Sequence, residues 1–368
     1  MISIVIPTYN EAAVIEETLR RASAALRGTG EGFELIVVDD SSADGTAERA
    51  ESLAGELPVR VLRRPGRLGL ATAVLDGWAA ARGKILGVMD ADLQHPPEVL
   101  RALVAALRQN NADLAIASRY VSGGGSSDWT WRRRAISRSA THLAATVLPL
   151  TLATVGDPMS GMFLVRSAAL EGAQLNPLGY KILLEVLAKA RYHTLVEVPY
   201  IFLERGHGSS KLGPRQYFEY LLHLARLAVA TGQLRQWFQY GMVGLSGALV
   251  DLALLYALVQ RAGWRPLAAL PVAIQMALLS NFLWNESLTF RSGLAYGPRG
   301  GVLARLLRYE WVCFPGALLN ALVTLLLIHQ GAGVLGAAAS GVAAGGVYNF
   351  LFNIPAIWRT WGRESSGA

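Results

Sequence analysis

Two aspartates and a glutamine lie close together in the stretch "VMDADLQHPPE", directly after a run that is typical of a buried strand. Asp90 and Asp92 are separated by one residue, and Gln94 follows two residues later. Carboxylates this close must be solvated, protonated or bridged by a cation, because their mutual repulsion opposes ionisation of both. Hard divalent cations prefer carboxylate and amide oxygens. The three side chains are therefore candidate metal ligands.

A second interpretation gives Asp92 a structural role as the N-cap of a helix that opens at Pro96, since aspartate is a common capping residue. The neighbouring residues favour the interpretation of Asp92 as a metal ligand. Two more aspartates, Asp39 and Asp40, end an earlier strand-like run. The carboxyl ends of parallel strands meet at one edge of a sheet, where ligands bind in such folds.

The elements that would position these residues are short β-rich segments alternating with helical ones. Helical periodicity covers residues 11–26 and 96–109. The predicted strands are Ile2–Pro7, Glu34–Asp40, Val59–Leu62, Lys84–Asp90 and Asp113–Ala117. This alternation predicts an α/β domain with a mostly parallel sheet covered on both faces.

The turn after the first predicted strand carries "PTYNE" in place of the glycine pattern of a dinucleotide-binding site, and no P-loop pattern is present. Asn10 of this turn falls at the same sheet edge as the aspartates. What remains is a nucleotide site without a glycine cradle, in which a cation must neutralise the phosphates.

Composition indicates a membrane protein. Of 368 residues, 52% are hydrophobic and only 17% are charged, and the apolar residues concentrate after Trp237. The net charge of +7 comes without an aromatic-basic module or zinc spacing, so we expect attraction to anionic lipid and no nucleic-acid partner. The single cysteine, Cys313, excludes a disulfide framework. The N-terminus is interpreted as a first strand and not as a signal peptide.

Four apolar stretches near the ~20 residues of a spanning helix cover 237–260, 267–290, 307–329 and 333–357. Basic residues concentrate at one side of them: Arg226, Arg235, Arg291, Arg299, Arg305, Arg308, Arg359 and Arg363. The opposite side carries Arg261 and Arg265. Both termini are therefore expected in the cytoplasm. Four buried helices of a soluble domain are the alternative.

Six linked motifs resemble those of the family-2 glycosyltransferases, and among these the polyprenyl (dolichyl) phosphate mannosyltransferases. They are "IPTYNE", "VVDDSSADGT", "MDADLQHPPE", "ASRY", "DPMSGMF" and "SSKLG". The later segments "FQYGMVGLSGALVD" and "SNFLWNESLTF" resemble the GtrA-like four-helix membrane domain. The resemblance implies a GT-A fold for residues 1–212, an amphipathic interface segment at 213–235, and an all-α transmembrane domain at 236–358.

The resemblance also implies site residues. Donor contacts would come from Pro7, Tyr9, Glu11, Val38, Asp40, Asp90, Ala91, Asp92, Arg119, Arg205 and Lys211. Asp92 and Gln94 would hold Mg²⁺ or Mn²⁺, and the catalytic set would be Asp92, Arg119, Arg205 and Lys211. Arg119, Arg133 and Ser137 would meet the acceptor lipid phosphate. For Arg133 the alternative is a general basic patch, Arg132–Arg134, on lipid headgroups.

The implied reaction is an inverting transfer of a hexose, with mannose from GDP-mannose preferred, onto a polyprenyl or dolichyl phosphate at the cytoplasmic face of the cytoplasmic membrane. A lipid phosphate is largely dianionic at neutral pH and needs alignment more than a general base. His95 and His207 therefore receive no catalytic role. Two alternatives stay open: a UDP-glucose enzyme that makes polyprenyl-phosphate glucose, and a translocator of lipid-linked sugars.

Overall fold

The computed structural model describes residues 1–127, 129–152, 154–204, 213–289 and 301–362. The chain divides into two compact units. The first comprises Met1–Ala144 and Val155–Leu227, and the second comprises Ala145–Thr154 and Ala228–Ala368. The division inside the 213–235 segment lies between Leu227 and Ala228. The domain boundaries expected from the sequence stay predictions.

The first unit is built on a seven-stranded sheet with the order β3-β2-β1-β4-β7-β5-β8. Its strands are β1 (Ile2–Thr8), β2 (Phe33–Asp39), β3 (Val59–Arg63), β4 (Ile85–Val88), β5 (Leu114–Ser118), β7 (Phe163–Arg166) and β8 (Leu195–Pro199). All neighbours are parallel except β7, which runs antiparallel to both β4 and β5. The predicted mostly parallel α/β sheet is confirmed.

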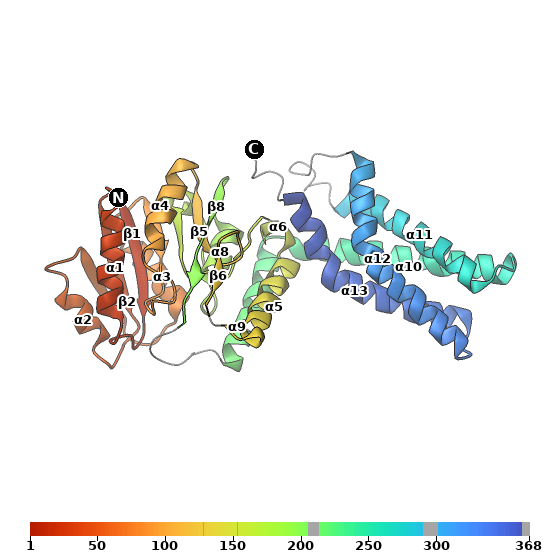
Figure 1. Ribbon diagram of the computed structural model, residues 1–368, viewed down its shortest axis with the longest axis horizontal. Helices are drawn as coiled ribbons and strands as arrows, with labels where there is room; N and C mark the ends of the chain where they lie inside the picture. The colour runs from red at the N-terminus through yellow and green to blue at the C-terminus, as the bar shows by residue number, and fades with distance from the viewer. Residues whose placement is uncertain (128, 153, 205–212, 290–300, 363–368) are drawn as a thin grey trace. The chain divides into compact units, whose positions relative to one another are not determined.

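Both faces of this sheet are covered by helices. On one face, β1 places Ile2, Ile4 and Ile6 in a core shared with α1 (Ile15–Arg27) and α4 (Val99–Gln109), which contact one another (Figure 1). On the other face, Val5 meets Gly77 of α3 (Leu70–Ala79), where a β-carbon would lie 2.5 Å from the valine side chain. The alternation follows from the two-residue period of a strand.

The remaining elements of this unit are shorter or lie beside the sheet. They are α2 (Thr46–Ser52), α5 (Trp131–Val147), α7 (Ser167–Leu170), α8 (Ile182–Lys189), α9 (Pro214–Ala230) and a two-stranded sheet of β6 (Gly125–Ser126) and β9 (Ile201–Phe202). The Tyr220 hydroxyl of α9 donates to the Ala140 carbonyl of α5 at 2.7 Å. The two helices are thereby tied together.

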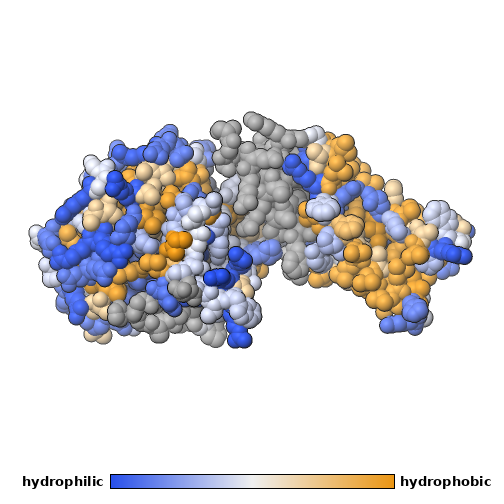
Figure 2. Space-filling model, in the orientation of Figure 1, coloured by the Kyte–Doolittle hydropathy of each residue, from blue (hydrophilic) through white to orange (hydrophobic). Residues whose placement is uncertain are grey.

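The second unit is helical and apolar on its outside. Its elements are α6 (Pro149–Leu152), α10 (Gln233–Tyr256), η1 (Ala257–Arg261), α11 (Pro266–Trp284), η2 (Asn285–Thr289), α12 (Val302–His329) and α13 (Val334–Gly362). Among the described residues, three helices are long and apolar enough to cross a membrane: Gln233–Arg261, Pro266–Leu288 and Val302–His329. Figure 2 shows hydrophobic side chains over much of this unit.

These helices match the first three predicted spans, and the fourth, 333–357, overlaps α13 from Val334 onward. At most 28% of the residues in any of the three spanning windows are buried. Helices at the centre of a soluble domain would bury most of their apolar residues. The alternative of four buried core helices is therefore disfavoured, and the chain is an integral membrane protein.

Candidate active site

The D-x-D segment lies in the loop between β4 and α4, beyond the carboxyl end of a strand near the middle of the sheet. The Asp92 carboxylate accepts a hydrogen bond from the Gln94 backbone N–H at 3.1 Å, and Leu93 between them has φ 58°. The helix begins only at Val99, after Glu98, and has no side-chain cap. The interpretation of Asp92 as a helix cap is therefore wrong.

Two contacts anchor this loop. The Ala91 carbonyl accepts from the Thr18 hydroxyl of α1 at 2.8 Å. The Gln94 side chain donates through Nε2 to the Leu203 carbonyl at 3.3 Å, and the Leu203 N–H donates to the Gln94 carbonyl at 2.9 Å. Because the amide nitrogen of Gln94 is held in this way, the orientation of its side-chain oxygen is fixed as well.

Gly161, in the "DPMSG" motif, allows the loop to approach closely. A β-carbon built on this residue would lie 2.3 Å from Oδ2 of Asp90 and 3.1 Å from Cε1 of His95. Only glycine fits there without displacing the aspartate. The glycine of the "DPMSGMF" motif is therefore explained by its close contact with Asp90 in the folded chain, which the spacing of the sequence does not reveal.

His95 is buried beside Asp90 but has the properties of a packing residue. Its ring stacks on Tyr200 at 5.3 Å and meets Phe202 edge-on at 5.1 Å. Burial lowers the pKa of His95 to about 4, so the ring is neutral at physiological pH. The absence of a catalytic role for His95 stays a prediction.

Arg119 follows β5 directly and forms a buried ion pair with Asp157. Nε and Nη2 of the guanidinium each donate to a different carboxylate oxygen at 2.7 Å, and the Arg119 backbone N–H adds a third bond at 3.0 Å. The side chain of Asp157 is fully buried, and that of Arg119 is 9% exposed. Sequence reasoning missed Asp157, although it begins the quoted "DPMSGMF" motif.

The three residues expected to bind the acceptor phosphate are brought together. Arg133 and Ser137 lie one turn apart on α5. The Ser137 hydroxyl is 2.9 Å from that of Tyr120, the neighbour of Arg119. The guanidinium groups of Arg119 and Arg133 both form cation–π contacts with the Trp129 ring, at 5.5 Å and 4.6 Å from its centroid. Trp129, which no sequence motif indicated, thus lies between the guanidinium groups of Arg119 and Arg133 and the residues around them.

On the donor side, Pro7 and Val38 are register partners on β1 and β2, and Tyr9 packs beneath the guanidinium of Arg67 at 4.3 Å. Glu11 is positioned by its backbone N–H, which donates to the Thr46 hydroxyl at 2.9 Å. Tyr9 and Glu11 follow the carboxyl end of β1, whereas Pro7 and Val38 lie within the last residues of β1 and β2.

Two predicted donor contacts have little surface to offer. Val38 is fully buried. The Asp40 carboxylate is 5% exposed and accepts from Arg64 at 2.7 Å and from the backbone N–H groups of Leu68 and Gly69 at 3.0 and 2.8 Å. In this conformation Asp40 holds the loop before α3. The donor roles of Val38 and Asp40 stay predictions that burial disfavours.

Lys181 is a further cation at the site that sequence reasoning missed. Its ammonium donates to the Met159 carbonyl at 2.9 Å. Burial and the neighbouring Arg119 lower its pKa to about 8, while Asp90 and Asp157 act in the opposite sense. Lys181 therefore lies close enough to Arg119, Asp90 and Asp157 to interact with their charges.

Arg205 and Lys211 lie outside the described residues. Within the described part of the chain, no group of three or more His, Cys, Asp or Glu side chains could hold a metal ion. A cation bound by Asp92 and Gln94 would therefore need further oxygens from its ligand, which the phosphates of a nucleotide can supply.

Comparisons with known proteins address both units. The model "Glycosyl transferase family 2" matches residues 3–172, and "GtrA/DPMS, transmembrane domain" matches residues 239–358. A dolichol-phosphate mannosyltransferase of Pyrococcus furiosus is 39% identical over 98% of this chain and 99% of its own length. One from Saccharomyces cerevisiae is 38% identical over 62% of this chain and 86% of its own.

Among solved structures, glucosyl-3-phosphoglycerate synthase from Mycobacterium tuberculosis is 22% identical, with a TM-score of 0.49 over 62% of this chain and 79% of that one.

Replacing Gly161 with alanine tests the close approach to the D-x-D loop. The added methyl group would have to displace the Asp90 carboxylate, so we expect nucleotide affinity to fall at least about tenfold, which corresponds to 1.4 kcal/mol. Isothermal titration calorimetry with a nucleoside diphosphate measures this affinity. Gly55→Ala is the control, since no atom lies within 4 Å of its added carbon. Unchanged affinity in Gly161→Ala would show that Asp90 can move without cost.

Proposed function

The chain belongs to the dolichol-phosphate mannosyltransferase family of glycosyltransferases, and on this basis we propose that it transfers mannose from GDP-mannose to the phosphate of a polyprenyl or dolichyl phosphate. The observation that carries the proposal is a row of ring contacts that joins the D-x-D loop to Arg119 and Arg133, two of the residues expected to bind the acceptor phosphate. His95 of the D-x-D loop meets Phe202 at 5.1 Å, Phe202 meets Trp129 at 5.3 Å, and Trp129 lies under Arg119 and Arg133.

A divalent cation, Mg²⁺ or Mn²⁺, fits the residues at the D-x-D loop. Asp92 offers a carboxylate and Gln94 an amide oxygen, both of the hard type that these ions prefer. The loop is fixed by Thr18 and Leu203, and Gly161 leaves space against Asp90. When bound, the cation would neutralise charge on the donor diphosphate, which is the leaving group.

The acceptor needs little activation from the protein. A phosphate monoester with a second pKa of about 6 is mostly dianionic at neutral pH, so its oxygen is already nucleophilic. Arg133 and Ser137 would orient it through charge-assisted and hydroxyl hydrogen bonds. Arg119 would contribute charge from its place beside Asp157, which fixes the direction of its guanidinium.

A single displacement at the anomeric carbon inverts its configuration. The phosphate oxygen forms the new bond as the bond to the diphosphate breaks, and the electron pair leaves with the diphosphate. An α-linked donor then gives a β-linked mannosyl phosphate lipid. Arg205 and Lys211, by their motif positions, would stabilise the departing charge.

Two alternatives are kept. The base and the sugar could instead be those of UDP-glucose, since the motif series identifies a sugar-nucleotide site but not its base or its sugar. A translocator of lipid-linked sugar would not need the D-x-D loop, whose anchoring favours the transferase. The distribution of basic residues around the spans supports a cytoplasmic location for the first unit, which holds the D-x-D loop, and for both termini.

Membranes containing the protein, incubated with radiolabelled GDP-mannose or UDP-glucose and a polyprenyl phosphate, test the proposal. We expect label to enter the lipid phase from GDP-mannose only, and only when the polyprenyl phosphate is added. Extraction into organic solvent and thin-layer chromatography measure it. Label from UDP-glucose alone would replace the donor assignment, and none from either would overturn the reaction.

The Asp92→Ala variant isolates the metal. Because Asp92 lies in a loop, where its carboxylate accepts from the Gln94 backbone N–H, and is not part of the apolar core, we expect the variant to stay folded and to lose transfer by about 10³-fold or more. Excess EDTA should do the same to the unaltered protein, and added Mg²⁺ or Mn²⁺ should restore it. Undiminished turnover in EDTA would remove the metal from the mechanism.

The Arg133→Lys variant separates a phosphate ligand from a general lipid anchor. Lysine keeps the charge but loses the planar group that bonds phosphate through two N–H donors. We expect transfer to fall about 10- to 100-fold, with nucleotide binding and membrane association unchanged. Arg132→Lys, on the same exposed turn, is the matched control. Full activity in Arg133→Lys would identify the arginine run as an anchor.

A further inference from the structure

Lys181 is a cation of the site to which the proposed reaction assigns no role. Its ammonium donates to the Met159 carbonyl at 2.9 Å and lies 4.8 Å from the centroid of the Tyr180 ring. An ammonium group carries three N–H donors. Among the described residues, only one of the three has an oxygen acceptor. The remaining donors are available to a ligand.

The position of Lys181 opposes a positive charge. Lys181 is the N-cap residue of α8, and the amino end of a helix carries a partial positive charge. Burial and Arg119 act in the same sense and lower the pKa of Lys181, although at about 8 the side chain stays mainly protonated at neutral pH. Departures of this kind from the local rules occur at functional sites. We therefore looked for a ligand that uses the charge.

Asp90 provides a complementary group beside Lys181. Its charge favours the protonated form of Lys181, so the two side chains are near neighbours. The Asp90 side chain is 29% exposed, and Lys181 is half-buried, so a ligand can reach both. A carboxylate accepts hydrogen bonds and an ammonium donates them, whereas a sugar hydroxyl does both. A neighbouring pair of these groups therefore suits two adjacent hydroxyls of a sugar.

Lys181 lies between the two substrates of the proposed reaction. Asp90 belongs to the D-x-D loop on the donor side, and Arg119 belongs to the set expected to bind the acceptor phosphate. Lys181 is close enough to interact with the charges of both. The group that passes between the donor diphosphate and the lipid phosphate is the hexose. The hexose is therefore the part of the substrates that Lys181 meets.

Electrostatics selects the side of the sugar ring that faces Lys181. In glycosyl transfer the anomeric carbon and the ring oxygen gain positive charge in the transition state. A cation beside those atoms would raise the barrier, because like charges repel. The cation is tolerated at the opposite side of the ring, where the hydroxyls at C3 and C4 lie. Both hydroxyls are equatorial in mannose and in glucose.

We propose that Lys181 binds the transferred hexose, with its ammonium donating to the hydroxyl at C3 or C4 while Asp90 accepts from the same diol. Lys181 is then a specificity-determining residue, which favours mannose and glucose over their 4-epimers. The inference rests on the proposed function for the reaction, and it adds a sugar contact that the sequence motifs do not indicate.

The Lys181→Met variant of the full-length protein in membranes tests the proposal, because methionine has a similar length but neither charge nor donor. Transfer to a polyprenyl phosphate is measured as kcat/KM with GDP-mannose and with its 2-deoxy, 3-deoxy and 4-deoxy forms. We expect the variant to lose about 10- to 100-fold with GDP-mannose and with the 2-deoxy donor. With the 3-deoxy or the 4-deoxy donor, the loss should shrink to less than about threefold, because the contacted hydroxyl is already absent.

Two controls accompany the variant. Lys84→Met removes an exposed lysine directly before β4, at the opposite end of that strand from the D-x-D loop, and should leave kcat/KM unchanged for every donor. GDP has no hexose, so its affinity for Lys181→Met, measured by calorimetry, should equal that for the unaltered protein. If GDP affinity falls, Lys181→Gln, which keeps an N–H donor, takes the place of the methionine variant in the same comparison.

The outcomes separate the inference from the reaction. An equal loss with all four donors overturns the sugar contact. A loss that appears only as a higher KM for the polyprenyl phosphate assigns Lys181 to the acceptor phosphate and also overturns it. If the unaltered protein uses UDP-glucose instead of GDP-mannose, the comparison is made with UDP-glucose and its deoxy forms, since the diol is shared. Transfer from neither donor would overturn the proposed function and this inference together.

Discussion

The active site is organised by the buried ion pair between Arg119 and Asp157. Removing two charges from water costs several kcal/mol each, and only close, well-oriented hydrogen bonds offset that cost. Asp157 meets the requirement by accepting three bonds from Arg119, while Glu197 of β8 holds the Asp157 backbone N–H at 3.0 Å. The end of β5, the "DPMSG" loop and β8 are therefore fixed relative to one another. That loop also carries Gly161 against Asp90 and the Met159 carbonyl that holds Lys181.

Much of the fold could be predicted because its signals are local. The strands β1 to β5 and the helix α1 follow from β-branched runs and a helical period, and Arg133 and Ser137 share α5 as their spacing indicated. The antiparallel strand β7 could not be predicted in the same way. It has four residues, and its place between β4 and β5 is determined by pairing with strands far away in sequence. The exit from β4 also comes earlier than expected, at Val88, which places Asp90 in the loop.

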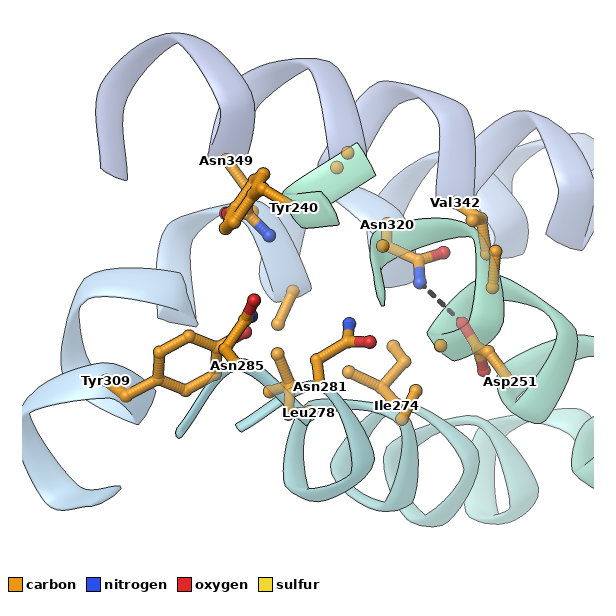
Figure 3. Close-up of a pocket in the computed structure, with 18 residues that line it drawn as sticks. Tyr240, Asp251, Ile274, Leu278, Asn281, Asn285, Tyr309, Asn320, Val342 and Asn349 are labelled. Carbon is orange, nitrogen blue, oxygen red and sulfur yellow. Dashed lines mark hydrogen bonds between the residues drawn. The ribbon is translucent and has the colours of Figure 1, made fainter. Parts of the chain in front are cut away.

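The candidate site was predictable as a set of motifs but not as a set of contacts. Motif position assigned Asp40 to the donor, yet the structure gives its oxygens to Arg64 and two backbone N–H groups. No local pattern pairs Asp40 with a residue 24 positions later. For the same reason the sequence did not indicate Asp157 and Trp129. Each contacts Arg119, and only folding brings Arg119 close to them. The membrane unit shows the converse, because its asparagines (Figure 3) were visible in the sequence and only glycines on the facing helices explain how they fit.

The antiparallel insertion of β7 also affects how the protein is made. β4 has β1 on one side and β7 on the other, and the β7 pairing joins Ile85 to Arg166. When only the first four strands have emerged from the ribosome, the nascent chain exposes an unpaired edge of β4, the strand that leads into the D-x-D loop. Open strand edges invite pairing with other chains. The nascent first unit is therefore vulnerable to aggregation until β7 emerges, and the loop after β4 gains its second neighbouring strand only after about 75 further residues have been made.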